Sequence, residues 1–203
     1  MSQEKFKRIL FTESFLKLSS AKKLAYVGVF TALSILVNVF LSIDVTPTQK
    51  ITFNYFASFF CGAFFGPIIG FVICFLGDLL AFLLPLNGGI YWLPTGICSG
   101  LLAFIPGIIF TTVRLKIKGA VYVKTAIAVT LMYLIVTCCL GALANYTYVK
   151  FVIYAGREYK TLFTAYLGAK ILFSSIVSAI NYALVFAVIP LVDLIKNSDL
   201  KLE

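Results

Sequence analysis

Two charged side chains stand inside apolar stretches of this chain, and both could bind a polar or ionic ligand. Between Lys50 and Arg114 the only charged residue is Asp78. Lys170 lies seven residues after Phe163, inside the last long apolar stretch. A charge buried in hydrocarbon costs several kcal/mol, so it must find a partner, lose its charge or face a cavity. Asp78 and Lys170 are therefore the first candidates for a functional site.

The composition is that of an integral membrane protein. The 203 residues are 61% hydrophobic and 12% charged, with a mean hydropathy of +1.02. In soluble domains about a quarter of the residues are charged. The length has room for about six helices of ~20 residues, each long enough to cross a hydrocarbon core of ~30 Å. We therefore expect an all-α membrane protein, a compact bundle of six transmembrane helices.

Turn residues and loops separate six apolar runs, which are the predicted spans. The runs cover residues 24–43, 51–65, 68–84, 90–112, 125–144 and 163–189. Gly66-Pro67 predicts a tight reversal after the second run, and Pro85 to Gly89 predicts a turn after the third. The second run is short, so its helix should be tilted, bent or shallow. The chain is then a single membrane domain, with the bundle at 24–195, an N-terminal segment at 1–23 and a tail at 196–203.

Basic residues predict the orientation of this bundle. Six spans put both termini on one side of the cell membrane. The N-terminal segment, the loop after the fourth span and the tail hold 6, 4 and 2 Lys or Arg, against 4 on the opposite side. The positive-inside rule then places both termini in the cytoplasm. Residues 42–50, 84–92 and 145–160 form the predicted outer face.

Asp78 and Lys170 should lie at similar depths below that outer face. Asp78 lies seven residues before Pro85, and Lys170 lies seven residues after Phe163, which is about 10 Å in each case at 1.5 Å per residue. One interpretation is a structural ion pair, since buried charges need partners. The other is a ligand site, because charges within a membrane often mark substrate pathways.

Further polar and aromatic residues near the outer face could complete a binding pocket. They are Lys50, Phe53, Tyr91, Trp92, Thr95, Asn145 and Arg157. Interfacial aromatic residues commonly form only an anchoring belt. The alternative for Tyr91-Trp92 is stacking on a flat ligand, because Gly88-Gly89 lets the backbone approach closely. Asn181, deep in the last span, could form the floor of the pocket or bond a neighbouring helix.

A stripe of small residues follows one side of the first predicted span. Its members are Ala21, Ala25, Gly28 and Ala32, at spacings of 4, 3 and 4. Small side chains let another helix approach closely in a membrane. The stripe could serve packing inside the bundle or docking of a partner subunit.

Several functional classes lack their residues in this chain. It has no GxxxxGK[ST] loop, so it cannot bind ATP by that route. It has no histidine, and its five cysteines lie in apolar runs without a CxxC pair, so neither a metal site nor the usual general base is expected. The net charge of +9 lies in short segments that flank the spans, which indicates lipid contact and not nucleic acid. We expect no enzyme, metal or cofactor.

The stretch from Lys50 to Ile109 resembles the substrate-binding S components of energy-coupling factor (ECF) vitamin transporters, most closely the folate group. The matching elements are the short second span closed by FGP, the GDLLAFLLP segment around Asp78, the glycine pair before Tyr91, and the following proline. The stripe on the first helix matches the one that this family uses for docking.

The resemblance implies a six-helix subunit that captures folate from outside and topples in the membrane to release it. Its partners would be a transmembrane coupling subunit and two cytoplasmic ATPases. A pterin could donate two hydrogen bonds to Asp78 and stack on Tyr91-Trp92. The glutamate carboxylates could meet Lys50, Arg157 or Lys160, while Lys170 could contact the ligand or neutralise Asp78.

The last predicted span departs from the folate group. It has Tyr166 to Lys170 where that group has a proline and an arginine, so Lys170 could take the place of the arginine. Riboflavin, thiamine and pantothenate are the alternative vitamins. A structural membrane protein without a solute is the alternative from another functional class.

Overall fold

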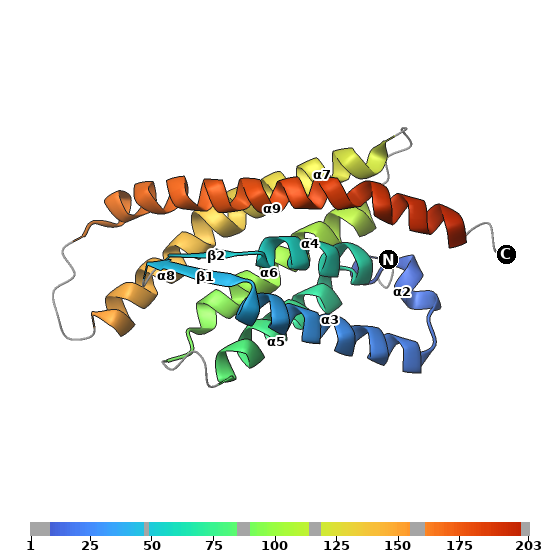
Figure 1. Ribbon diagram of the computed structural model, residues 1–203, viewed down its shortest axis with the longest axis horizontal. Coiled ribbons are helices and arrows are strands. Elements are labelled where there is room, and N and C mark those ends of the chain that lie inside the picture. Colours follow the sequence, from blue (N-terminus) through green and yellow to red (C-terminus); the bar gives the residue numbers. More distant parts are fainter. Residues whose placement is uncertain (1–8, 47–48, 85–89, 114–118, 155–160, 200–203) are drawn as a thin grey trace.

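Apart from one β-hairpin, the chain is helical in the computed structural model (Figure 1). The structure describes residues 9–46, 49–84, 90–113, 119–154 and 161–199, and the side chains of all of these except 13–14, 44–46, 49–50 and 191–199. The helices are α2 (Glu13–Lys17), α3 (Ser20–Phe40), α4 (Asn54–Phe65), α5 (Pro67–Leu83), α6 (Leu93–Thr112), α7 (Ala120–Leu131), η2 (Met132–Gly141), α8 (Ala142–Tyr148), η3 (Val149–Ile153) and α9 (Phe163–Asp199).

Each predicted span lies on a helix. Within the described part of the chain, four helical stretches are long and apolar enough to cross a membrane, at Ser20–Phe40, Leu93–Thr112, Ala120–Ile153 and Phe163–Pro190. The apolar helix α5 has 17 residues and α4, on the second predicted span, has 12. The short second helix is therefore confirmed, while six complete crossings stay a prediction.

The helices pack as a bundle around a shared apolar core. Figure 1 shows α9 and α7 along one side, α3 and α5 along the other, and α4 and α6 between them. Phe59, Leu102, Met132 and Val185 are buried in one cluster, which joins α4, α6, η2 and α9. Helix α2 and the end of α9 lie at the same end of the molecule (Figure 1), while the placement of both termini on one side of the membrane stays a prediction.

The predicted reversal between the second and third spans is confirmed. Gly66 has a φ of 92°, which is strained for any residue with a side chain. A Cβ at Gly66 would also lie 2.9 Å from the carbonyl oxygen of Leu10. Pro67 follows at the start of α5, where its missing N–H has no helical partner to lose.

Glycines also allow α4 to cross α6 at very short range. A Cβ added at Gly62 would collide with the backbone carbonyl oxygen of Ala103. A Cβ added at Gly107 of α6 would lie 2.5 Å from the Cα of Pro67, the first residue of α5, so α6 also lies close to the turn between α4 and α5. Glycine at these positions therefore brings the short second helix into the centre of the bundle.

Part of the N-terminal segment folds back against this turn. Phe15 of α2 is buried, and its ring packs edge-on against that of Phe65, with 5.5 Å between the ring centroids. Thr12 donates a hydrogen bond to the carbonyl oxygen of Phe64 at 2.5 Å. Thr111, at the end of α6, donates to the carbonyl oxygen of Ile9 at 3.0 Å. The segment from Ile9 onward therefore closes the end of the bundle at which α4 turns into α5.

The loop predicted at residues 42–50 is instead a β-hairpin. Strands β1 (Ser42–Thr46) and β2 (Gln49–Thr52) pair antiparallel, with Ile43 opposite Ile51. The hairpin is rich in β-branched residues, which favour strands. The apolar run from residue 51 therefore begins as a strand, and α4 starts only at Asn54.

The segment after residue 144 also differs from its prediction. It was expected to lie outside the fifth span, but the fifth helix continues to Ile153. Helices α7, η2, α8 and η3 follow one another without a break over Ala120–Ile153, which we call the composite helix. Residues 120–153 contain no proline to end it. The η2 part is π-helical over 10 residues, a conformation that is often found at functional sites.

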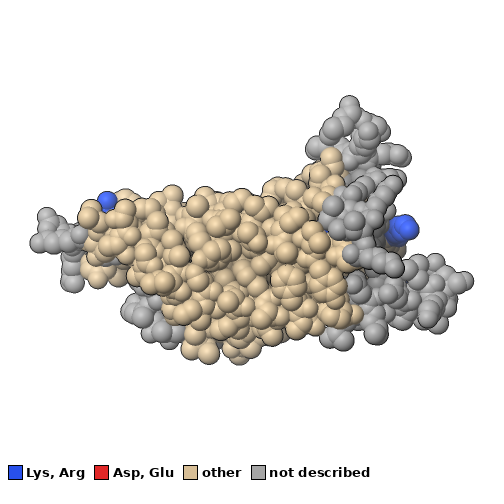
Figure 2. Space-filling model, turned by 90° about the horizontal axis from the view of Figure 1, so that it is seen from above, with Lys and Arg blue, Asp and Glu red and all other residues tan. Residues whose placement is uncertain are grey.

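The surface is consistent with a membrane environment. Figure 2 shows the side along which α9 and α7 run, with Lys and Arg only near its two ends on the described surface. An uncharged band with basic residues near its two ends is the pattern expected of a protein that crosses a bilayer.

Candidate ligand-binding site

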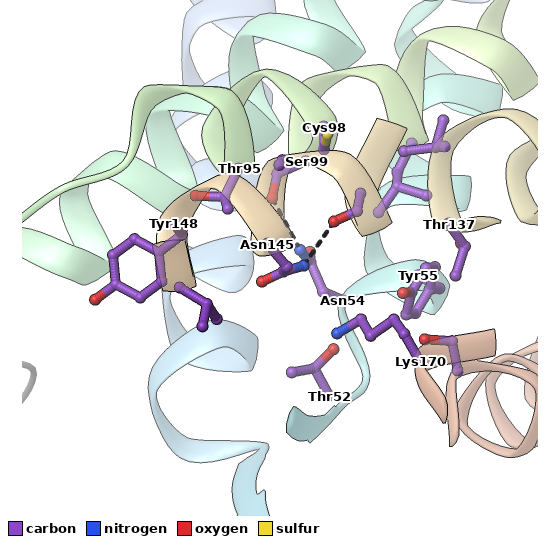
Figure 3. A pocket seen from close by; sticks show the side chains of 16 residues that line it. Thr52, Asn54, Tyr55, Thr95, Cys98, Ser99, Thr137, Asn145, Tyr148 and Lys170 are labelled. Carbon is purple, nitrogen blue, oxygen red and sulfur yellow. Dashed lines mark hydrogen bonds between the residues drawn. The ribbon is translucent and has the colours of Figure 1, made fainter. Parts of the chain in front are cut away.

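A cavity of about 260 Å³ lies between the β2–α4 junction, α6, the composite helix and α9 (Figure 3). Leu102, Val136 and Val149 supply part of its apolar wall. Its polar lining residues are Thr52, Asn54, Tyr55, Thr95, Cys98, Ser99, Thr137, Asn145, Tyr148, Lys170 and Ser174. A concave site with several convergent polar groups is typical of small-molecule binding.

Lys170 is the charged member of this lining. It extends from α9 into the cavity, toward the part lined by Asn54 and Asn145 (Figure 3). Within the described residues, no other charged side chain lines the cavity. An ammonium group with three donors binds carboxylates by charge-assisted hydrogen bonds. The cavity therefore favours a ligand with a negative charge or several acceptor atoms.

Asp78 on α5 lies next to the cavity and is connected to it through a chain of hydrogen bonds. Its two carboxylate oxygens accept from the Tyr91 hydroxyl at 3.2 Å and the Ser99 hydroxyl at 3.1 Å. Asn54 approaches the Ser99 hydroxyl at 3.5 Å, and Ser58 donates to Asn54 at 3.2 Å. Ser99 and Asn54 line the cavity, so Asp78 helps to fix the orientation of two lining side chains.

The two charged side chains within the predicted spans, Asp78 and Lys170, have different neighbours in the structure. Asp78 accepts hydrogen bonds from Tyr91 and from α6, whereas Lys170 lies on the α9 wall. Among the described contacts there is no ion pair between Asp78 and Lys170. The interpretation as a mutual ion pair therefore has no support in these contacts.

Tyr91 and Trp92 connect the start of α6 to its neighbours. Burial and the Asp78 carboxylate raise the pKa of Tyr91, so its hydroxyl stays protonated and can donate. Trp92 Nε1 donates to the carbonyl oxygen of Ala144 at 2.9 Å, and its ring lies 6.2 Å from that of Tyr148. Both residues thus support walls of the cavity, and their stacking on a ligand stays a prediction.

Asn181 forms hydrogen bonds to neighbouring elements, as the second of the two interpretations of this residue proposed. This side chain is 1% exposed. It donates to the carbonyl oxygens of Thr52 and Val177 and accepts from the backbone N–H of Phe56. Phe53 lies within the segment that Asn181 holds, at the start of α4. Both residues belong to the support of the cavity.

The structure thus brings most of the predicted site residues to one region. Thr95, Asn145 and Lys170 line the cavity. Phe53, Asp78, Tyr91, Trp92 and Asn181 contact or adjoin lining residues. The Lys50 side chain, Arg157, Lys160, Gly88 and Gly89 lie outside the described residues.

Several lining residues were not singled out from the sequence. They include Thr52, Asn54, Ser99, Thr137 and Ser174. The available signal was their polarity within apolar runs, because such side chains need a partner in the membrane. Residues of these types are too frequent in the spans for polarity alone to select them.

The small-residue stripe on α3 is not used for packing within the described bundle. Ala21, Ala25, Gly28 and Ala32 are all exposed. A Cβ added at Gly28 would have no described atom within 4 Å. Docking of a partner on this stripe stays a prediction.

Comparisons with known proteins give one family and one fold. The family model described as "ECF-type riboflavin transporter, S component" matches residues 18–197. No curated protein matches the chain. A solved structure, "Crystal structure of FolT bound with folic acid", matches with a TM-score of 0.63 and 18% identity, over 82% of this chain and 92% of that chain. At this identity the likeness shows a shared fold.

Proposed function

We propose that this chain, which belongs to the family of ECF-type riboflavin transporter S components, is the folate-binding subunit of an ECF importer. The family is one of vitamin transporter subunits and not of enzymes, and the chain is a multi-pass membrane protein. Its task would be to capture folate outside the cell and present it for import.

The observation that carries the choice of folate is Lys170 in the cavity. Folate carries two carboxylates, whereas riboflavin is neutral, thiamine is a cation, and pantothenate has one carboxylate but no ring for the aromatic side chains of the cavity. A hydrogen bond to a charged group contributes about 1.5–3 kcal/mol. A carboxylate of folate would gain this energy at Lys170, and thiamine would be repelled.

The rest of the lining suits the other parts of folate. Asn54, Asn145 and Ser99 offer amide and hydroxyl groups that can match the alternating donors and acceptors of a pterin. Tyr55 and Tyr148 add aromatic rings to the same cavity. The shared fold with a structure that contains folic acid also supports this choice.

Import would require partners that supply energy. We propose that the exposed stripe on α3 docks on a transmembrane coupling subunit, which two cytoplasmic ATPases drive. The exposure of all four small side chains supports this use of the stripe. The proposed orientation has both termini in the cytoplasm.

Riboflavin is the second candidate, because the matching family model carries its name. Its hydroxylated chain could bond the hydroxyl side chains of the cavity, among them Thr95, Ser99, Thr137 and Ser174. It has no carboxylate for Lys170. The two candidates therefore differ in how strongly they depend on that side chain.

Mass spectrometry of the ligand that co-purifies with the protein tests the proposal directly. We expect folate or a folate derivative. Riboflavin would overturn the folate assignment and keep the transporter role. If no ligand co-purifies, a thermal shift panel of vitamins decides, since a ligand at a thousandfold excess over Kd stabilises a binder by about 4 kcal/mol. No shift with any vitamin would overturn binding altogether.

Lys170→Met tests the role of the cavity cation. We expect folate affinity, measured by titration, to fall at least tenfold. Lys150→Met is the matched control, because Lys150 is exposed and is not among the lining residues. Equal affinities in the two variants would show that Lys170 does not bind the ligand.

A further inference from the structure

Helix α4 begins without a capping side chain of its own. The residue at its N-cap position is Phe53, which makes no capping hydrogen bond. The first backbone N–H groups of a helix have no partner within the helix, and a side-chain oxygen normally accepts from one of them. In this chain Asn181 Oδ1 accepts from the N–H of Phe56, the third residue of α4, at 3.2 Å. The cap comes from α9, 125 residues further along the chain.

The amide nitrogen of Asn181 completes the connection. Nδ2 donates to the carbonyl oxygen of Thr52 at 2.8 Å and to that of Val177 at 2.9 Å. An asparagine has both a donor and an acceptor group, and the two groups here face partners of opposite kind. Because the side chain is 1% exposed, loss of these bonds would leave buried backbone groups unsatisfied.

The segment that Asn181 holds is part of the cavity wall. Thr52, Asn54 and Tyr55 all line the cavity, and they fall within the four residues that precede Phe56. Lys170 lines the cavity from α9, the helix that also carries Asn181. It precedes Asn181 by 11 residues, which is about 16 Å along the helix. Asn181 therefore fixes one wall of the cavity relative to the helix that carries its charge.

We infer that Asn181 is a positioning residue of the ligand site, which caps α4 from α9 and holds Thr52, Asn54 and Tyr55 in their binding arrangement. It acts through the backbone of that segment and does not need to touch the ligand. The effect on affinity rests on the proposed function, while the cap itself can be tested without any ligand.

Asn181→Leu removes both halves of the amide at similar volume. We expect amide hydrogen exchange to quicken at least tenfold at residues 54–57 of the ligand-free protein. We also expect at least tenfold weaker vitamin binding through faster dissociation. Trp92, the single tryptophan of the chain, lies beside the cavity and can report binding by its fluorescence. Asn181→Asp keeps an acceptor for Phe56 and should retain more exchange protection than the leucine variant.

Val185→Ala separates positioning from general loss of stability. Val185 is fully buried on the same helix and does not line the cavity, so its truncation should lower the melting temperature and leave affinity unchanged. An equal loss of affinity in Val185→Ala would overturn the inference. So would wild-type exchange and affinity in Asn181→Leu, or in Asn181→Ala, which also removes both halves of the amide, if the leucine variant does not fold. Absence of vitamin binding by the wild-type protein would instead overturn the proposed function, and the exchange measurement would still decide the cap.

Discussion

Asp78 binds hydroxyl groups from two parts of the chain, so its replacement tests the chain of hydrogen bonds beside the cavity. In Asp78→Asn, the new amide would place a donor toward Tyr91 or Ser99, each of which now donates to the carboxylate. A donor toward Ser99 would be the more unfavourable of the two, because the Ser99 hydroxyl oxygen already faces the donor group of Asn54. We expect vitamin affinity, measured by titration, to fall at least tenfold, or about 1.4 kcal/mol.

Tyr91→Phe is the comparison for this change, because it removes one donor and leaves the carboxylate in place. It should weaken binding less than Asp78→Asn does. Wild-type affinity in Asp78→Asn would show that the network does not organise the site and would also reject Asp78 as a ligand group.

At the residue scale, the sequence identified charges better than it identified their partners. Asp78 and Lys170 are conspicuous because they interrupt apolar stretches. Tyr91 and Ser99, which donate to Asp78, lie 13 and 21 positions later in the sequence. Their approach depends on how α5 packs against α6, which no local pattern encodes. For the same reason the role of Asn54 could not be predicted.

At the scale of elements, the crossing of α4 and α6 depends on the absence of a side chain at Gly62. In Gly62→Ala, the added methyl group would meet the carbonyl oxygen of Ala103. Overpacking of this kind costs about 1–3 kcal/mol. We therefore expect a lower melting temperature in detergent, measured by thermal unfolding.

Gly168→Ala is the control for this prediction. Gly168 is an exposed residue of α9, and a Cβ there would have no described atom within 4 Å. Alanine is favoured over glycine in a helix by about 1 kcal/mol. Gly168→Ala should therefore match or exceed the wild-type melting temperature. If both variants melt like the wild type, the close crossing does not limit stability.

The elements that were predicted are those with a strong local signal. Long apolar runs identified the helices, and Gly66-Pro67 identified the reversal between α4 and α5. The β-hairpin was missed because its second strand runs directly into the apolar run of α4. The end of the composite helix was missed because Asn145 to Tyr148 look like a loop by composition. In the structure Asn145 and Tyr148 line the cavity, and the Tyr146 ring packs on Phe163 and Tyr166 of α9, so tertiary packing explains their helical conformation.

At the scale of the whole molecule, capture and delivery of the vitamin should be separable. Gly28 lies on the exposed stripe of α3 and does not line the cavity. We expect Gly28→Trp to bind the vitamin with wild-type affinity and to lose most uptake when reconstituted with the proposed coupling subunit and ATPases. A bulky side chain there would prevent close approach of a partner helix.

Leu33→Trp is the matched control on the same helix. Leu33 is also exposed, and it lies about 140° around the helix from Gly28 at ~100° per residue. It should retain both binding and uptake. Full uptake by Gly28→Trp would reject the stripe as the docking surface.

The N-terminal segment has a consequence for the order in which the protein assembles. Thr111 bonds the carbonyl oxygen of Ile9 across 102 positions of sequence. A ribosome that has just released α3 has not yet made α4, α5 or α6, so the segment cannot yet have these partners. Its hydrogen bond to Thr111 can form only after translation has passed residue 111. The segment that precedes α3 therefore reaches its final contacts only after α4, α5 and α6 have been made.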